Sequence, residues 1–143
     1  MIQGIIEYPA EILRVNCSEV LDYNEALQVL AKDMKDTTRY YNGLGLAAPQ
    51  IGVAKQVIIV SCDKKLEAMI NPTIIHQSQE RSTYQEGCLS LPTYFAMISR
   101  PKKVTVECHD EFGDLKVYTL TGINAHVLQH EIDHLRGKLL IDY

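Results

Sequence analysis

The pattern of hydrophobic and polar positions predicts a helix in the first third of the chain. Apolar residues recur at helical spacing from Ala26 to Met34, with polar residues between them. Asn24 stands just before this run and can cap the helix, and the acidic Glu25 falls in its first turn. Gly43 is suited to end it. We therefore expect one helix between Asn24 and Gly43.

The middle of the chain contains short stretches that predict strands. Gln56 to Cys62 is short and rich in β-branched residues, which is typical of a buried strand. Asn71-Pro72 interrupts the pattern before a second strand-like stretch, Thr73 to His76. We therefore expect Asn71-Pro72 to separate this stretch from what precedes it.

A hairpin and a second helix are predicted in the last third. Lys103 to His109 and Lys116 to Leu120 are β-rich, and turn-forming residues separate them. From about Gly122 to Arg136 the apolar residues return to helical spacing, and Gly137 can end that helix. Because the strands lie together between two helices, the order favours an α+β fold over alternating β-α-β units.

Length and composition fit one domain that spans residues 1–143. A chain of 143 residues can bury a sizeable core, and 46% hydrophobic with 22% charged residues is ordinary for a globular protein. The net charge of −4 argues against a nucleic-acid-binding surface, and no apolar run is long enough to span a bilayer. The first ten residues lack the basic start of a signal peptide. We expect no membrane partner and no direct nucleic-acid binding.

The strongest local signal is His130-Glu131-Ile132-Asp133-His134, on the second predicted helix. Two histidines four residues apart rise about 6 Å and share one helix face, so both imidazoles can reach one metal ion. Glu131 stands beside them and can take a proton from a metal-bound water and pass it to a leaving amine. The alternatives are a chance pair of histidines and a structural metal site with four protein ligands.

Two histidines need a third protein ligand. Among the candidates, His126 is four residues before His130, but three successive turns span about 12 Å, too far for one ion. We expect His126 at a pocket edge or on the surface. Cys88 is the best candidate, because it lies in a glycine-containing segment whose amides can point into a site. Taken alone, a cysteine such as Cys88 is more often a small buried residue than a ligand. The other candidates are several carboxylates and Cys17, Cys62, Cys108, His76 and His109.

The four cysteines allow two disulfides in principle. Without a secretion signal, free thiols or a metal ligand are the better interpretation.

Three segments together resemble the peptide deformylase family. Gly43 to Gln50 reads GLGLAAPQ and is similar to the family's G-x-G-x-A-A-x-Q, while Glu86 to Ser90 matches its E-G-C-L-S. Gln129 to Leu135 matches its Q-H-E-x-D-H-L, and the three segments occur in the family's order. The resemblance covers essentially the whole chain. It implies a compact α+β fold with antiparallel β-sheets packed around a central HExxH-bearing helix and without a C-terminal helical extension.

The resemblance implies a metal-dependent hydrolase that removes the N-formyl group from formyl-methionine at the start of nascent polypeptides and releases formate. Cys88, His130 and His134 are the implied metal ligands. A metal-bound water would attack the formyl carbon, with Glu131 as general base and then general acid. The implied cofactor is one divalent ion, Fe²⁺ first, with Zn²⁺, Ni²⁺ or Co²⁺ able to occupy the same site.

The resemblance also implies how a substrate is held. The Gln50 side-chain amide and the Leu89 backbone N–H would face the developing oxyanion. The peptide would lie as an added strand between the two glycine-containing segments. Leu44 and Val127, with Ile123 as a further candidate, would line an apolar pocket for the methionine side chain, although such positions pack in a core as often. The implied substrate-binding residues are Leu44, Gly45, Glu86, Gly87 and Val127.

The implied partners are formylated N-termini of nascent peptides, with the ribosome as a further candidate. We expect a monomer in a bacterial cytoplasm, encoded by the bacterium or by a phage that infects it. Two positions depart from the family's usual pattern, namely Gln85, where an acidic residue is common, and His126, where Arg or an apolar residue is common. The chain also ends nine residues after His134.

Two other functions compete with this interpretation. An endopeptidase of the HExxH class shares the helix but gives no reason for Gly43 to Gln50 or for a cysteine ligand. A non-catalytic formyl-peptide or metal-binding module would be favoured if Glu131 or Gln50 were replaced, and both are present.

Overall fold

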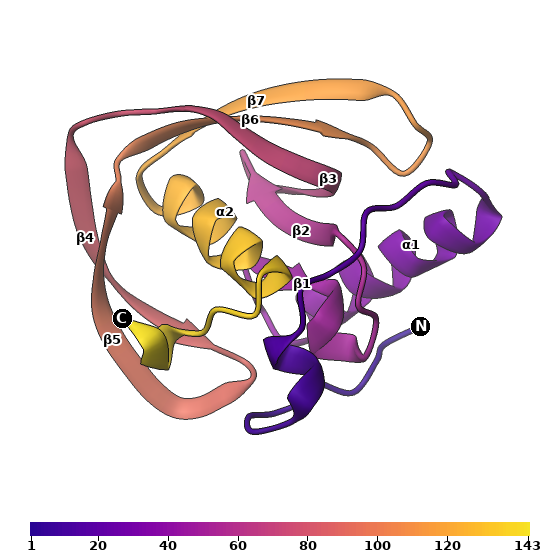
Figure 1. The fold of residues 1–143 in the computed structure, drawn as a ribbon, viewed down its shortest axis with the longest axis horizontal. Helices are drawn as coiled ribbons and strands as arrows, with labels where there is room; N and C mark the ends of the chain where they lie inside the picture. Colours follow the sequence, from indigo (N-terminus) through magenta and orange to yellow (C-terminus); the bar gives the residue numbers. More distant parts are fainter.

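The computed structural model describes all residues from 1 to 143 and has an α+β architecture (Figure 1). The helices are α1 (Glu25–Tyr40) and α2 (Gly122–Leu135), with short 3₁₀ segments at Glu11–Arg14, Ala48–Ile51 and Leu140–Asp142. The strands are β1 (Gly45–Ala47), β2 (Val57–Cys62), β3 (Lys65–Gln77), β4 (Arg81–Cys88), β5 (Leu91–Pro101), β6 (Lys103–His109) and β7 (Leu115–Thr121). They form a five-stranded sheet in the order β1-β2-β3-β6-β7 and a separate β4-β5 hairpin. Neighbouring strands are antiparallel throughout.

Helix α1 forms where the sequence predicts it. The Asn24 side chain accepts a hydrogen bond from the Leu27 N–H at 3.1 Å and so caps the first turn. The buried stripe of α1, which includes Leu27, Ala31 and Met34, packs in a hydrophobic cluster with residues of β2. The amphipathic pattern thus covers one face of the sheet.

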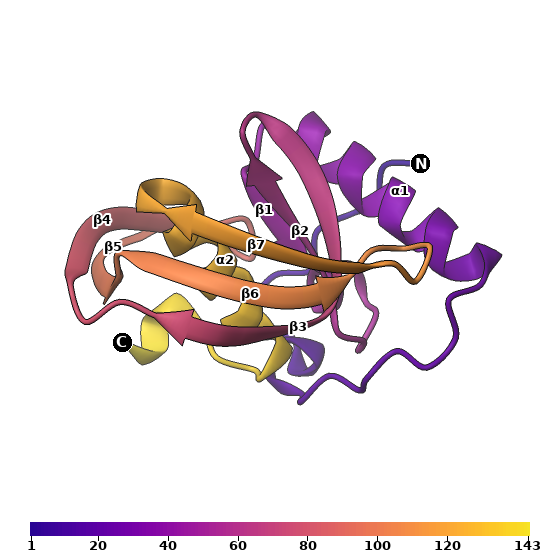
Figure 2. The same ribbon diagram turned by 90° about the horizontal axis from the view of Figure 1, so that it is seen from above.

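Strand β2 is buried on both faces, which explains its continuous apolar sequence. Val57 and Ile59 belong to the cluster beneath α1, while Ile58 and Val60 belong to the cluster that contains α2. Alternate side chains of a strand point to opposite faces, so β2 separates the two helices. Figure 2 shows α1 and α2 on opposite sides of the β1–β2 region.

Helix α2 lies at the centre of the molecule. Figure 1 shows it enclosed by the five-stranded sheet and the β4-β5 hairpin, with α1 outside this enclosure. Its apolar residues Ala125, Leu128 and Ile132 pack against the sheet in the larger core cluster. This arrangement confirms the predicted antiparallel sheets around a central HExxH-bearing helix, and it places the HExxH segment inside the protein.

The middle strands differ from the prediction. β3 continues from Lys65 to Gln77 through Asn71-Pro72, so this dipeptide does not separate two segments. It forms a bulge instead: the pairing with β6 shifts between Ile70 and Thr73, and Asn71 has a φ of 52°. The Asn71 side chain bonds the backbone of Val20 at 2.9 Å in both directions, which holds the bulge in place.

The chain follows α2 with a short 3₁₀ turn rather than another α-helix. Leu139 and Leu140 pack with Leu13, Leu91 and Ile98 in a third hydrophobic cluster, which holds this segment against β5. All four cysteines are free thiols, as the sequence predicts. None of the helices is both long enough and apolar enough to span a membrane.

Candidate metal centre and active site

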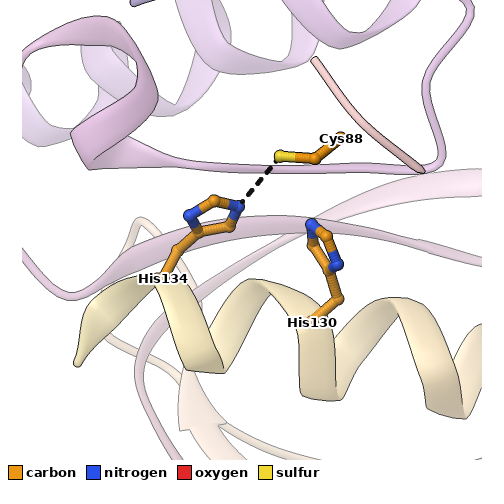
Figure 3. Close-up of side chains that lie close together, drawn as sticks. All are labelled: Cys88, His130 and His134. Carbon is orange, nitrogen blue, oxygen red and sulfur yellow. Dashed lines mark hydrogen bonds between the residues drawn. The ribbon is translucent and has the colours of Figure 1, made fainter. Parts of the chain in front are cut away.

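The three predicted metal ligands converge although they come from distant parts of the chain. His130 and His134 stand one turn apart on the same face of α2, and Cys88 ends β4 opposite them (Figure 3). The possible ligand atoms all lie within 4.8 Å of one another. Cys88 Sγ is 3.4 Å from His134 Nε2. One thiol and two imidazoles facing a common point form a ligand set suited to a transition-metal ion.

The surroundings of these ligands also fit a cation. Burial lowers the pKa of His130, but the Glu131 carboxylate, the Cys88 thiol and the Glu86 carboxylate raise it to about 10. The two carboxylates that favour a proton on His130 also favour a metal ion beside it. Burial lowers the pKa of His134 well below its usual value, so its imidazole is neutral, which is the form that binds metals.

Glu131 lies inside the protein next to these ligands. It is 5% exposed, and its Oε1 is buried without a hydrogen-bond partner in the protein. Burial raises the pKa of Glu131 to about 7, although the charge of His130 opposes the shift. A buried carboxyl group with one free oxygen is chemically able to accept and return a proton close to a bound substrate.

Gly45 lets β1 approach the Glu131 side chain. A Cβ atom at this position would lie 2.6 Å from Glu131 Oε2 and 2.7 Å from Val127 Cγ1. Any other residue would push Glu131 away from its present position, because both contacts are closer than van der Waals distance. The absence of a side chain at position 45 therefore has a steric explanation, which the sequence alone does not show.

The amide group of Gln50 is held in one orientation. Its Oε1 accepts a hydrogen bond from the Ala47 N–H at 3.0 Å, so its Nε2 must point the other way. Nε2 donates to Ser90 Oγ at 3.1 Å and lies 3.6 Å from Cys88 Sγ. The Ser90 hydroxyl in turn donates to the Ile6 carbonyl oxygen at 2.7 Å. Ser90 thus accepts from Gln50 Nε2, which also faces the candidate ligand Cys88.

Ser90 is a site residue to which the sequence analysis assigned no role. It is fully buried, and a buried hydroxyl needs partners. A serine two residues after the candidate cysteine was the available signal, but its partners Ile6 and Gln50 are far away in the sequence.

Glu86, one of the implied substrate-binding residues, has its carboxylate held by other groups of the protein. Both of its carboxylate oxygens are engaged by Arg100 at 2.8 and 2.9 Å, and they also contact His126 at 2.8 Å and His130 at 3.2 Å. Burial alone would raise the pKa of Glu86, but the hydrogen bonds from His130, Arg100 and His126 lower it to about 2. A carboxylate with these partners can fix the orientation of its neighbours.

His126 lies at the edge of the candidate cavity, one of the two places expected for it. It is 1% exposed, so the surface alternative does not apply. Its Nδ1 contacts Glu86 and its Nε2 contacts Ser82 Oγ at 3.1 Å. These contacts turn both ring nitrogens toward other residues, away from the three ligand atoms.

A cavity of about 600 Å³ opens onto the candidate centre. Its wall includes predicted residues from every part of the site, namely Leu44, Gly45, Gln50, Glu86, Gly87, Cys88, Leu89, Ile123, Val127, His130 and Glu131. Other wall residues were not predicted, and they include Tyr41, Asn42, Tyr84, Pro92, Thr93 and Phe95. Several of these come from the β4-β5 hairpin, which the sequence analysis did not identify as strands.

Comparison with known proteins agrees with this geometry. Residues 2–143 match the family model described as polypeptide deformylase. A peptide deformylase of Rhizobium meliloti is 42% identical over 99% of this chain and 84% of its own length. The crystal structure of peptide deformylase from Thermotoga maritima superposes with a TM-score of 0.96 at 34% identity, covering 99% of this chain and 97% of that one. The Ehrlichia chaffeensis peptide deformylase in complex with actinonin gives a TM-score of 0.96 at 34% identity, covering 99% and 88%.

Proposed function

Because the chain belongs to the polypeptide deformylase family, it is a hydrolase that removes N-formyl groups from nascent peptides, and we propose that Cys88, His130 and His134 hold its metal ion. The observation that carries this proposal is the convergence of three ligand atoms within 4.8 Å beside Glu131 and an open cavity. We propose Fe²⁺ as the ion, with Zn²⁺, Ni²⁺ or Co²⁺ able to replace it. When bound, the ion supplies Lewis-acid polarisation of the formyl oxygen and makes water a stronger nucleophile.

Glu131 is the proton carrier of the proposed mechanism. Its carboxylate accepts a proton from the attacking water while the water oxygen bonds to the formyl carbon. When the bond from that carbon to the peptide nitrogen breaks, Glu131 returns the proton to the leaving amine, and formate and a free N-terminus result. Two observations support this role of Glu131: it directly follows His130 in the sequence, and its Oε1 has no hydrogen-bond partner in the protein.

Gln50 and Leu89 stabilise the negative charge that develops on the formyl oxygen. The Gln50 amide is already oriented by Ala47 and Ser90, so its remaining N–H needs no reorganisation when the charge appears. We place the Leu89 backbone N–H on the other side of this oxygen, because Leu89 follows Cys88 and lines the same cavity. Two fixed donors of this kind act only in the transition state, which is where they raise the rate.

The substrate peptide binds as an additional strand. β1 is the edge of the five-stranded sheet and has only β2 as a neighbour, so one of its edges is available for pairing. Gly45 on β1 and Gly87 on β4 both border the cavity. Leu44, Val127 and Ile123 supply apolar surface for the methionine side chain. Hydrogen bonds to the backbone give affinity for any sequence, and the apolar pocket selects methionine.

We propose that residues 1–143 act as one catalytic domain and as a monomer. The substrates are formylated N-termini of nascent peptides, with the ribosome as a candidate partner. The proposed location is the cytoplasm of a bacterium. The supporting observation is the likeness to bacterial peptide deformylases over nearly the whole chain.

The deciding experiment measures hydrolysis of formyl-Met-Ala-Ser by protein purified without oxygen, with metal content determined on the same sample. We expect turnover that a chelator abolishes and that added Fe²⁺ restores. Actinonin, which is bound in the Ehrlichia chaffeensis structure, should inhibit it. Acetyl-Met-Ala-Ser is the matched control, and cleavage within that peptide would support an endopeptidase instead. A fully metal-loaded protein that leaves the formyl peptide intact would contradict the proposal.

A further inference from the structure

The Tyr143 side chain contacts two charged residues, Asp133 on α2 and Arg100 on β5. Its hydroxyl donates a hydrogen bond to Asp133 Oδ2 at 2.5 Å and accepts one from Arg100 Nη1 at 2.9 Å. Arg100 Nη1 also donates to Asp133 Oδ2 at 2.9 Å, so the three groups form a closed triangle. The Arg100 guanidinium also lies 4.9 Å from the centre of the Tyr143 ring. Tyr143 therefore fixes one end of the guanidinium both by hydrogen bonding and by stacking.

The other end of the same guanidinium holds Glu86. Arg100 Nε and Nη2 donate to the two Glu86 oxygens at 2.8 and 2.9 Å. Both partners are buried, with Arg100 3% exposed and Glu86 9% exposed. A guanidinium is a rigid plane, so a rotation that shifts Nη1 also shifts the two nitrogens that hold Glu86.

Glu86 connects this pair to a metal ligand. Its Oε1 lies 3.2 Å from His130 Nδ1, which places a proton on that nitrogen and leaves Nε2 for the metal ion. Carboxylates in this position fix the ring orientation of a histidine ligand. A continuous set of polar contacts thus runs from Tyr143 through Asp133 and Arg100 to Glu86 and His130.

We propose that Tyr143 is a positioning residue for the metal centre: by holding Asp133 and Arg100, it fixes Glu86 and thereby the orientation of His130. This inference rests on the proposed role of His130 as a metal ligand. The alternative is that Tyr143 only stabilises the 3₁₀ segment Leu140–Asp142. Removal of its hydroxyl would then lower stability and leave metal binding unchanged.

The test is Tyr143→Phe, which removes the hydroxyl and keeps the ring. Protein loaded with Co²⁺ is titrated with a competing chelator, and its visible absorption spectrum is recorded. We expect the dissociation constant for Co²⁺ to rise about 3- to 10-fold, less than the roughly 10- to 100-fold typical for direct outer partners such as Glu86 in Glu86→Gln. We also expect a shifted Co²⁺ spectrum, because the geometry of the His130 ligand changes.

Tyr23→Phe is the matched control. The Tyr23 hydroxyl accepts a hydrogen bond from Asn71 Nδ2 at 3.3 Å, at the β3 bulge, so this variant also loses one partly buried hydroxyl contact. It should lower thermal stability without changing the affinity for Co²⁺. Asp133→Asn removes the charge that Arg100 and Tyr143 contact. It tests the effect of these contacts on the metal centre independently if Tyr143→Phe accumulates poorly.

The double variant Glu86→Gln with Tyr143→Phe tests the route of the effect. If Tyr143 acts through Glu86, the second substitution should change the Co²⁺ affinity by less than about 2-fold in this background. An undiminished effect there, or unchanged affinity and spectrum in Tyr143→Phe alone, would overturn the inference. A wild-type protein that neither binds Co²⁺ nor deformylates would instead overturn the proposed function, so the two failures are distinguishable.

Discussion

Helix α1 keeps every charged side chain out of its buried stripe, whereas α2 buries His126, Gln129, Glu131 and His134. The two buried threonines of α1 are satisfied by the helix itself, through hydrogen bonds to carbonyl oxygens one turn earlier. His126, Gln129 and His134 of α2 have partners on distant strands. Glu131 Oε1 and His134 Nδ1 have no hydrogen-bond partner in the protein. Burying a polar group costs free energy unless it is paired. The difference indicates that α1 is selected for packing and α2 for chemistry.

Replacing Glu131 gives the largest expected effect on the α2 side. In Glu131→Ala we expect the metal to remain bound and kcat to fall by about 10²- to 10⁴-fold, because the proton carrier is lost. The measurement is kcat for formyl-Met-Ala-Ser together with metal content. Glu25→Ala, in the exposed first turn of α1, is the control and should leave both unchanged. Full activity in Glu131→Ala would refute the assignment of the base.

Replacing Gln50 tests whether a second polar side chain of the site acts in the transition state. Gln50→Ala should lower kcat by about 10²- to 10³-fold with little change in KM, since an oxyanion donor acts mainly in the transition state. Ser90→Ala leaves Gln50 Nε2 without its acceptor and should have a smaller effect in the same direction. Equal losses in kcat and in substrate affinity for Gln50→Ala would instead indicate a role in binding the ground state.

The matching test on α1 concerns stability. Met34 is fully buried in the cluster between α1 and β2, so Met34→Ala should lower the free energy of unfolding by about 2–5 kcal/mol. Denaturant unfolding measures this change, and kcat per folded molecule should stay at the wild-type value. Val29→Ala, at a 52% exposed position of the same helix, is the control. A large loss of kcat in folded Met34→Ala protein would contradict the assignment of packing to α1 and of chemistry to α2.

The smallest expected effect is at the start of α1. Asn24→Ala removes the cap on the Leu27 N–H and should lower stability by about 1 kcal/mol, with unchanged activity. Asn24→Asp keeps a side-chain acceptor and should restore most of the loss. A stability equal to wild type in Asn24→Ala would show that the first turn of α1 does not need its cap.

The same contrast explains which parts of the structure were predictable from the sequence. The start and the buried face of α1 follow from a local pattern, namely a cap at Asn24 and apolar spacing up to Met34. The β6-β7 hairpin is local too, with both strands and its turn within 19 residues, 103 to 121. His130 and His134 needed only the helical repeat. Each of these depends on residues close in sequence.

What the sequence did not provide depends on contacts between distant residues. The β4-β5 hairpin was missed because many of its side chains are polar or exposed, so it lacks an apolar pattern. The contacts that give Glu86 its partners span 14 residues to Arg100 and 40 to His126. Cys88 became a convincing ligand only through the family resemblance, since nothing in its spacing relates it to His134, 46 residues away.

The position of α2 after the seven strands also sets when the core can pack during synthesis. Translation produces all seven strands before the helix that fills the space between them. Until Gly122–Leu135 has emerged, Ile58, Val60, Val104 and Val106 have no helix to pack against. Such an unfinished chain exposes apolar surface to its neighbours. Two of the three candidate ligands lie in this same helix, so packing of the core and assembly of the metal centre coincide.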